Sequence, residues 1–82
     1  MTTGTTAGTT KLNLRSVRCT RGVSLSSIAE LTKIGTMYLE AIESERFDRL
    51  PGQIYTVSYI RQYARAIGYD EDRILRLYMG GA

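Results

Sequence analysis

The chain has 82 residues and a formal net charge of +3, with 43% hydrophobic and 23% charged residues, so it holds one small domain at most. It contains no histidine and a single cysteine, which disfavours general-base catalysis and excludes both an intramolecular disulfide and a cysteine-based zinc cage. No apolar run approaches the ~20 residues that a membrane helix needs. The composition therefore predicts a soluble, cytoplasmic module without a cofactor or metal, and it disfavours an enzyme.

The two ends of the chain differ from its middle. After the initial Met, residues 1–10 are threonine, glycine and one alanine, and we expect a disordered tail or a cloning remnant there. Residues 11–79 form the predicted domain, and 80–82 form a flexible end. Residues 1–25 carry four basic residues and no acid, whereas residues 26–51 carry a net charge of −2. This pattern predicts a dipolar surface rather than a continuous basic stripe.

Five helical segments are predicted, and no strand pattern competes with them. They cover roughly 11–21, 24–32, 36–44, 53–67 and 71–78. Gly22 and Gly68 are placed to end the first and fourth segments, while Ser24 and Asp70 are placed to cap the second and fifth. The predicted fold class is therefore all-α.

Helical periodicity predicts which side chains face the core. The expected core positions are Leu14, Val17, Leu25, Ile28, Ala29, Thr32, Leu39, Ile42, Val57, Ile60, Ala64, Ile67, Ile74, Leu75 and Tyr78. Phe47 and Leu50, in the loop before the fourth helix, are expected to fold back on the core as a plug. We expect Tyr63 on a flank that supports the fifth helix, Cys19 half-buried and Leu31 exposed.

The segments 24–32 and 36–44 are typical of a helix-turn-helix, because a three-residue turn joins them and the small Ala29 lies where they cross. The predicted architecture is a compact five-helix helix-turn-helix domain of the Cro/repressor type. If such a domain bound DNA, the residues facing the nucleic acid would be Arg15, Arg18, Thr36, Met37 and Tyr38.

The second helix of this pair lacks the chemistry of a DNA reader. Its expected exposed positions, which also include Glu40 and Ala41, offer no bidentate contact to guanine or adenine. Three glutamates, Glu40, Glu43 and Glu45, are expected near the presented face and would repel phosphates. DNA binding is therefore disfavoured, although the basic first helix leaves weak nonspecific binding open.

The fourth helix carries the most informative pattern. Tyr55 and Tyr59 lie one turn apart, roughly opposite the predicted core face, and Gln62 and Ala66 continue the same line. Tyrosine is a preferred interface anchor because it supplies contact area and a hydroxyl at little entropic cost. The sequence therefore predicts a protein-binding surface at Tyr55, Tyr59 and Gln62. The alternative is that Tyr55 packs under the Phe47–Leu50 plug or against the fifth helix.

Several strings together indicate a specific family. They are Gly22-Val23-Ser24-Leu25, Tyr38-Leu39-Glu40-Ala41-Ile42-Glu43, Leu50-Pro51-Gly52 and Tyr59-Ile60-Arg61-Gln62-Tyr63-Ala64-Arg65-Ala66-Ile67-Gly68. On these strings the chain from Leu14 to Tyr78 resembles the cytoplasmic helix-turn-helix domain of the RodZ family of bacterial cell-shape proteins. The loop motif and the tyrosine-rich string are much more specific than a generic helix-turn-helix.

The resemblance implies a domain that binds the bacterial actin MreB rather than DNA. Two aromatic residues on the fourth helix of that family contact the filament subunit, and they match Tyr55 and Tyr59. Full-length family members continue through a basic linker into a membrane span, which implies a link between cytoskeleton and membrane in cell-shape control. Related domains in transcriptional regulators keep a DNA-binding regulator as the alternative, and a self-associating module is a third possibility.

Overall fold

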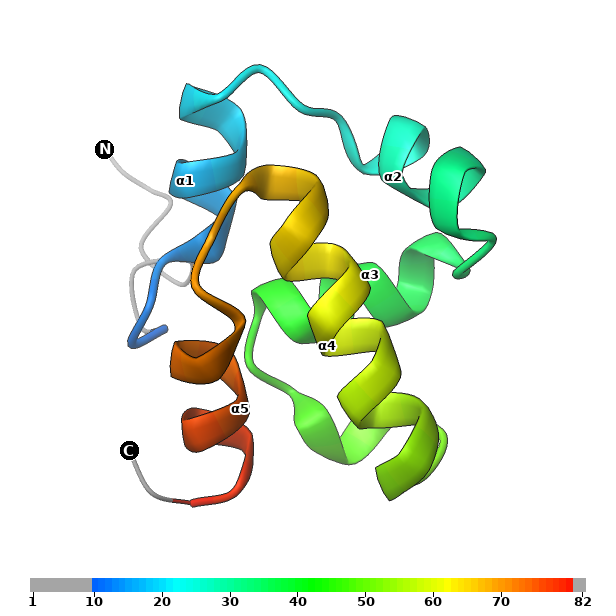
Figure 1. Cartoon of the computed structure of the whole chain (residues 1–82), viewed down its shortest axis with the longest axis vertical. Helices are drawn as coiled ribbons and strands as arrows, with labels where there is room; N and C mark the ends of the chain where they lie inside the picture. Colours follow the sequence, from blue (N-terminus) through cyan, green and yellow to red (C-terminus); the bar gives the residue numbers. More distant parts are fainter. Residues whose placement is uncertain (1–9, 81–82) are drawn as a thin grey trace, which may run out of the picture.

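The computed structural model describes residues 10–80 and folds them into five α-helices and one short 3₁₀ helix, with no strand in that range (Figure 1). The elements are α1 (Leu14–Thr20), α2 (Leu25–Thr32), α3 (Thr36–Glu43), the 3₁₀ helix η2 (Phe47–Arg49), α4 (Gln53–Ile67) and α5 (Glu71–Tyr78). The predicted all-α fold class is confirmed. The expected tail and flexible end lie outside the described residues, apart from Thr10 and Gly80.

Three helix ends form at the residues predicted for them. The Ser24 hydroxyl accepts a hydrogen bond from the Ser27 backbone N–H at 3.1 Å and caps α2. The Asp70 carboxylate accepts one from the Asp72 backbone N–H at 3.0 Å and caps α5. Gly68 ends α4 with a φ of 70°, a left-handed conformation that costs glycine little because it has no side chain. Local chemistry therefore sets these boundaries.

The first helix begins later than predicted, at Leu14 rather than Lys11. Asn13 has a φ of 53°, which is left-handed and cannot continue a right-handed helix. The backbone N–H groups of Lys11 and Leu12 donate to the Glu45 carboxylate at 2.8 and 2.7 Å. A distant carboxylate thus satisfies these donors outside any helix, which the local sequence pattern does not reveal.

The core draws side chains from all five α-helices. Its buried members are Leu14, Ile28, Ile34, Leu39, Ile42, Ile60, Tyr63, Ala64, Ile67 and Ile74. Most of these positions were predicted from helical periodicity. Ile34, in the connecting turn, was missed, and the prediction that Tyr63 lies on a flank is wrong because its side chain is fully buried. Cys19 is less buried than predicted, because its side chain is exposed rather than half-buried.

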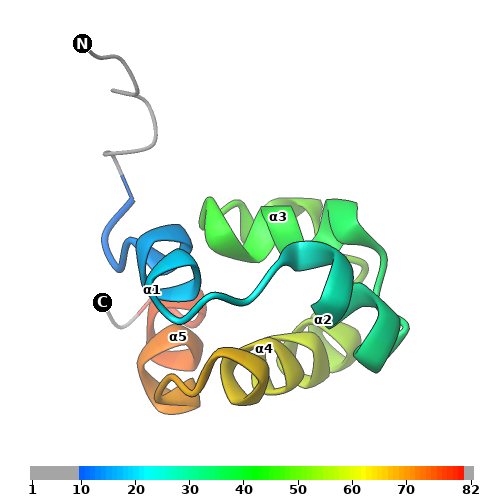
Figure 2. The same ribbon diagram turned by 90° about the horizontal axis from the view of Figure 1, so that it is seen from above.

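Helix α4 is the central element of the packing. Helices α3 and α4 lie on opposite sides of the core, with α1 and α5 at one end and α2 at the other (Figure 1 and Figure 2). The predicted plug is confirmed, because Phe47 and Leu50 pack half-buried against the core, with the Phe47 ring centroid 5.5 Å from that of Tyr78. The outer side of α4 is left to solvent.

Candidate functional site

Three tyrosine rings form a row that runs from α3 to α4. The ring centroids of Tyr38 and Tyr59 are 5.7 Å apart, and those of Tyr59 and Tyr55 are 6.2 Å apart, both pairs in tilted arrangements. Such separations are typical of favourable aromatic pairs. The helical repeat brings Tyr55 and Tyr59 one turn apart, and the packing of α3 against α4 adds Tyr38. Tyr55 stands at the outer end of the row and is 60% exposed.

The two predicted anchor tyrosines differ in burial. Tyr55 projects into solvent as predicted, whereas Tyr59 is half-buried and packs against the core. The prediction that both tyrosines lie opposite the core is therefore wrong for Tyr59. Thr56 and Tyr63 are buried, which widens the core face of α4 on this side. At 100° per residue, Tyr59 lies about 40° around the helix from the buried Tyr63.

Ile54 extends this surface and was missed by the sequence reasoning. Its side chain is 83% exposed, more than any other large hydrophobic side chain in residues 10–80. The available signal was an isoleucine that helical periodicity leaves outside the core face. Gln62, one turn after Tyr59, is half-buried and donates from its amide to the Ser58 hydroxyl at 3.1 Å. We define the aromatic face as Ile54, Tyr55, Tyr59 and Gln62.

Arg18, a predicted nucleic-acid contact, is instead a structural residue. Its side chain is 12% exposed, its Nε and Nη2 donate to the Glu43 carboxylate, and its Nη1 donates to the Val23 carbonyl at 2.9 Å. Glu43, only 8% exposed, also accepts a hydrogen bond from the Tyr63 hydroxyl at 2.8 Å. One buried carboxylate thus joins α1, α3 and α4. The prediction that Arg18 faces nucleic acid is wrong.

This buried network fixes the protonation of two of its members. The hydrogen bond to the Glu43 carboxylate raises the pKa of Arg18 above its already high ordinary value, so the guanidinium stays charged. Burial raises the pKa of Tyr63 far above its ordinary value, and the negative charge of Glu43 raises it further. Tyr63 therefore acts as a neutral hydroxyl donor, and Glu43 alone balances the positive charge of Arg18.

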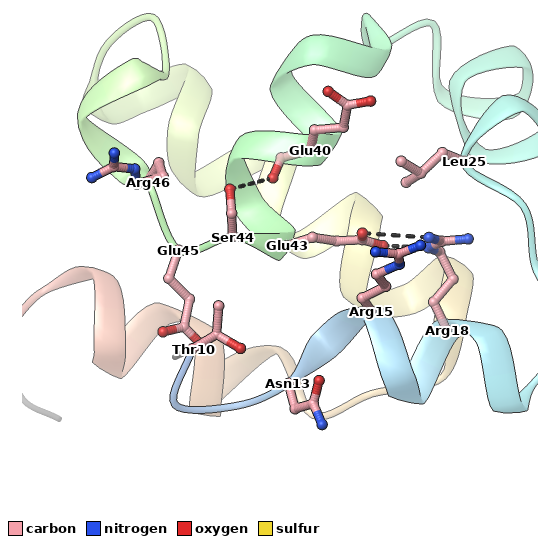
Figure 3. A pocket seen from close by; sticks show the side chains of 10 residues that line it. All are labelled: Thr10, Asn13, Arg15, Arg18, Leu25, Glu40, Glu43, Ser44, Glu45 and Arg46. Carbon is pink, nitrogen blue, oxygen red and sulfur yellow. Dashed lines mark hydrogen bonds and ion pairs between the residues drawn. The ribbon is translucent and has the colours of Figure 1, made fainter. Parts of the chain in front are cut away.

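A cleft of about 870 Å³ lies between α1 and α3 (Figure 3). Its charged lining consists of Arg15, Arg18, Arg46, Glu40, Glu43 and Glu45. Figure 3 shows the Arg18–Glu43 pair bridging the cleft, with Arg15 beside it. The two signs of charge are balanced, so the lining produces no strong field for a phosphate or for a cation.

The other residues predicted to face nucleic acid do not form a DNA-reading surface. Arg15, Thr36 and Met37 are exposed, but Tyr38 is half-buried in the tyrosine row. Helix α3, which would enter a major groove, carries no arginine, lysine, asparagine or glutamine, and its exposed Glu40 opposes phosphate.

The prediction of which α3 side chains are exposed also needs correction. Ala41 and Glu43 were expected on its exposed face, but their side chains are 4% and 8% exposed. Glu43 is neutralised by Arg18 inside the molecule, so it does not contribute to the expected repulsion of phosphates. Glu45 is half-buried and holds the backbone of residues 11 and 12.

Two further properties concern residues 10–80. No group of three or more histidine, cysteine, aspartate or glutamate side chains in this range is arranged to hold a metal ion. No helix in the same range combines the length and apolar character needed to cross a membrane.

Comparison with known proteins adds a family match. A family model described as a helix-turn-helix domain matches residues 13–74. The chain is 38% identical over 69 residues to the cytoskeleton protein RodZ of Streptococcus pneumoniae, which covers 84% of this chain and 25% of that protein. It is 40% identical over 52 residues to the uncharacterized membrane protein YmfM of Bacillus subtilis, and the match covers 63% of this chain and 18% of that protein. The chain thus spans a quarter or less of these relatives. No solved structure matches it.

Proposed function

The chain belongs to the helix-turn-helix domain family and is a domain of the RodZ type, and from this premise we propose that it is a non-enzymatic adaptor of the bacterial cytoskeleton. In this proposal the partner is the bacterial actin MreB, and the contact surface is the aromatic face. One relative is named a cytoskeleton protein and another a membrane protein. The proposed role joins the two, with the domain linking filament and membrane on the cytoplasmic side in cell-shape control.

The observation that carries the proposal is the exposure of Ile54 and Tyr55 on a helix whose other side already packs against the core. Ile60, Ala64 and Ile67 are buried on that inner side, while Ile54 and Tyr55 are 83% and 60% exposed. Contiguous exposed apolar side chains are typical of protein interaction sites. Tyrosine and isoleucine could insert into an apolar pocket of the partner, with Gln62 on the polar rim.

The competing function, a DNA-binding regulator, has less support. It predicts duplex binding that falls steeply with salt and is lost when Arg15 is neutralised. Arg18 cannot serve in that role because its guanidinium is occupied by Glu43 and Val23. A self-associating module, the third function, predicts a molecular mass that rises with concentration and no filament binding.

The test is co-sedimentation of the domain with polymerised MreB. Tyr55→Ala should weaken binding by about tenfold or more, because truncating a central interface tyrosine commonly has an effect of this size. Tyr55 is preferred to Tyr59 as the test position because Tyr59 also packs against the core. Met79→Ala is the matched control, since Met79 is 63% exposed, close to the 60% of Tyr55, and lies just after α5.

Three outcomes distinguish the candidate functions. Binding by wild type and by Met79→Ala, with loss in Tyr55→Ala at unchanged helical content, supports the adaptor. Equal binding by all three proteins would show that Tyr55 does not contribute to the interface and would overturn the aromatic face as the contact surface. Absence of binding by wild type overturns the adaptor proposal, and a duplex titration across salt concentrations together with sedimentation equilibrium then decides between the other two functions.

A further inference from the structure

A shallow groove between α2 and α4 adjoins the aromatic face. It has a volume of about 280 Å³ and is lined by Leu31, Thr32, Gln62, Arg65 and Ala66. Figure 2 shows α2 packed beside α4 at the end of the molecule away from α1 and α5. Gln62 belongs both to this groove and to the aromatic face, one turn after Tyr59. The two features therefore form one continuous surface across α2 and α4.

Leu31 gives the groove an apolar wall that the core does not use. Its side chain is 76% exposed although it lies in a well-capped helix whose Ile28 is buried. Ala66 is small and leaves room beside Leu31, and the Thr32 hydroxyl already donates to the backbone carbonyl of Ile28 at 2.7 Å. The groove can therefore receive an apolar side chain.

Positive charge is in excess where Arg65 lines the groove, and Arg61 lies one turn earlier on α4, outside the lining. Arg61 and Arg65 both pair with the single carboxylate of Glu71, with Nε–O distances of 3.5 and 3.1 Å. Two guanidinium groups thus share one negative charge, and within residues 10–80 neither has another ionic partner. Their side chains remain 52% and 71% exposed. Exposed pairs of this kind contribute little to folding, so the guanidinium groups can turn to a different carboxylate.

We propose that this α2–α4 groove is a second subsite for the same filament subunit, and that it takes a segment of the subunit in which a carboxylate flanks an apolar side chain. The inference rests on the proposed function and extends it from α4 to α2. Charge complementarity selects the occupant: a carboxylate in the groove balances the charge of Arg65, which shares its one carboxylate partner with Arg61, whereas a basic segment is repelled. The apolar side chain of the segment packs between Leu31 and Ala66.

Three substitutions test the subsite by co-sedimentation with polymerised MreB. Leu31→Ala should weaken binding about fivefold through loss of apolar contact, and Arg65→Gln should weaken it about threefold through loss of the cation. Glu71→Gln should tighten binding about twofold, because it releases both guanidinium groups to the partner. A purely structural role for Glu71 cannot produce this gain. Met79→Ala is the control for exposed apolar truncation, and circular dichroism melts report folding.

The outcomes separate the subsite from the proposed function. If wild type does not bind, both proposals fail. If wild type binds and Tyr55→Ala does not, while Leu31→Ala and Arg65→Gln bind as wild type, the adaptor stands and the subsite is overturned. Sedimentation equilibrium tests whether a second copy of the chain occupies the groove instead. If wild type is a dimer and Leu31→Ala is a monomer with unchanged filament binding, the groove belongs to a second copy and the subsite is overturned.

Discussion

The buried side of α4 carries a polar network beside its apolar core residues, and its exposed side carries two large apolar side chains. On the inner side, the Tyr63 hydroxyl meets the Glu43 carboxylate, which also holds the Arg18 guanidinium, all with little exposure to solvent. On the outer side, Ile54 and Tyr55 stand largely in water. The inner groups are paired with one another and hold the fold, whereas the outer side chains stay exposed and contribute little to the core. The contrast separates residues that build the scaffold from residues free to bind a partner.

The same contrast explains why a basic first helix does not make a phosphate-binding surface. Arg18 is occupied by Glu43, and Arg21 donates from its guanidinium to the carbonyls of Ile67 and Gly68 at the end of α4. A cation near the C-terminus of a helix is favourable because it complements the helix dipole. Two of the four basic side chains in residues 1–25 thus fasten α1 to the rest of the domain.

The largest effect is expected from breaking the inner network at Glu43. Glu43→Ala leaves the Arg18 guanidinium, which is 12% exposed, bonded to the Val23 carbonyl but without a carboxylate partner, and breaking a buried ion pair typically costs about 3–5 kcal/mol. A domain of this size has a total stability of about 5 kcal/mol, so the variant should be largely unfolded or close to it. Urea denaturation followed by circular dichroism measures the loss.

Glu40→Ala is the matched control for this prediction. Glu40 lies one turn earlier on α3, is exposed, and makes no side-chain ion pair within residues 10–80. Its replacement should change the free energy of unfolding by less than about 0.5 kcal/mol. Equal stabilities of the Glu43 and Glu40 variants would show that the buried carboxylate does not hold the scaffold.

A smaller effect, with a defined pH dependence, is expected at Tyr63. Tyr63→Phe removes the donor to Glu43 and should cost about 1–2 kcal/mol. Burial raises the pKa of Tyr63 in the folded state above its ordinary value of about 10. Below pH ~10 the hydroxyl is protonated in both states. Above that pH the unfolded state loses its proton first, so stability falls by up to about 1.4 kcal/mol per pH unit.

Urea denaturation between pH 9 and 11 measures this slope. Tyr63→Phe should remove most of it, because phenylalanine has no proton to lose. Tyr55→Phe is the control for removing a tyrosine hydroxyl from the exposed side of α4. A slope that persists in Tyr63→Phe would assign the alkaline loss of stability to another group.

The features that could be predicted from the sequence are those set by local rules. The caps at Ser24 and Asp70 and the stop at Gly68 depend on residues within one turn, and the C-terminal end of α4 followed from Gly68. The exposure of Tyr55 followed from the helical repeat alone. The tyrosine string also carried the family resemblance, which the match to a RodZ protein confirms.

The features that could not be predicted depend on contacts between distant residues. Arg18 and Glu43 are 25 residues apart, and Tyr63 and Glu43 are 20 apart. Each of these side chains alone fits a solvated or flanking position on its helix, so periodicity assigned Arg18 to a surface and Tyr63 to a flank. The half-burial of Tyr59 has the same origin. Because Tyr63 is buried, the core face of α4 is wider than periodicity predicted and extends to Tyr59.

The smallest effect is expected where the two sides of α4 meet, at the tyrosine row. Tyr59→Ala removes packing against Tyr38 and the core and should cost about 1 kcal/mol, whereas Tyr55→Ala should change stability by less than about 0.5 kcal/mol. Urea denaturation of both variants measures the difference. Equal costs would mean that the row is energetically uniform and that Tyr55, despite its exposure, belongs to the scaffold.

Two variants at Tyr59 decide how a loss of filament binding is interpreted. If Tyr59→Ala weakens filament binding, part of the loss arises from a disturbed row, because Tyr59 touches both Tyr38 and Tyr55. Tyr59→Phe keeps the ring and its packing and removes only the hydroxyl. Wild-type stability with weakened binding in Tyr59→Phe would place that hydroxyl in the interface. Full binding would show that the Tyr59 hydroxyl makes no necessary contact, so that a loss in Tyr59→Ala would belong to its ring.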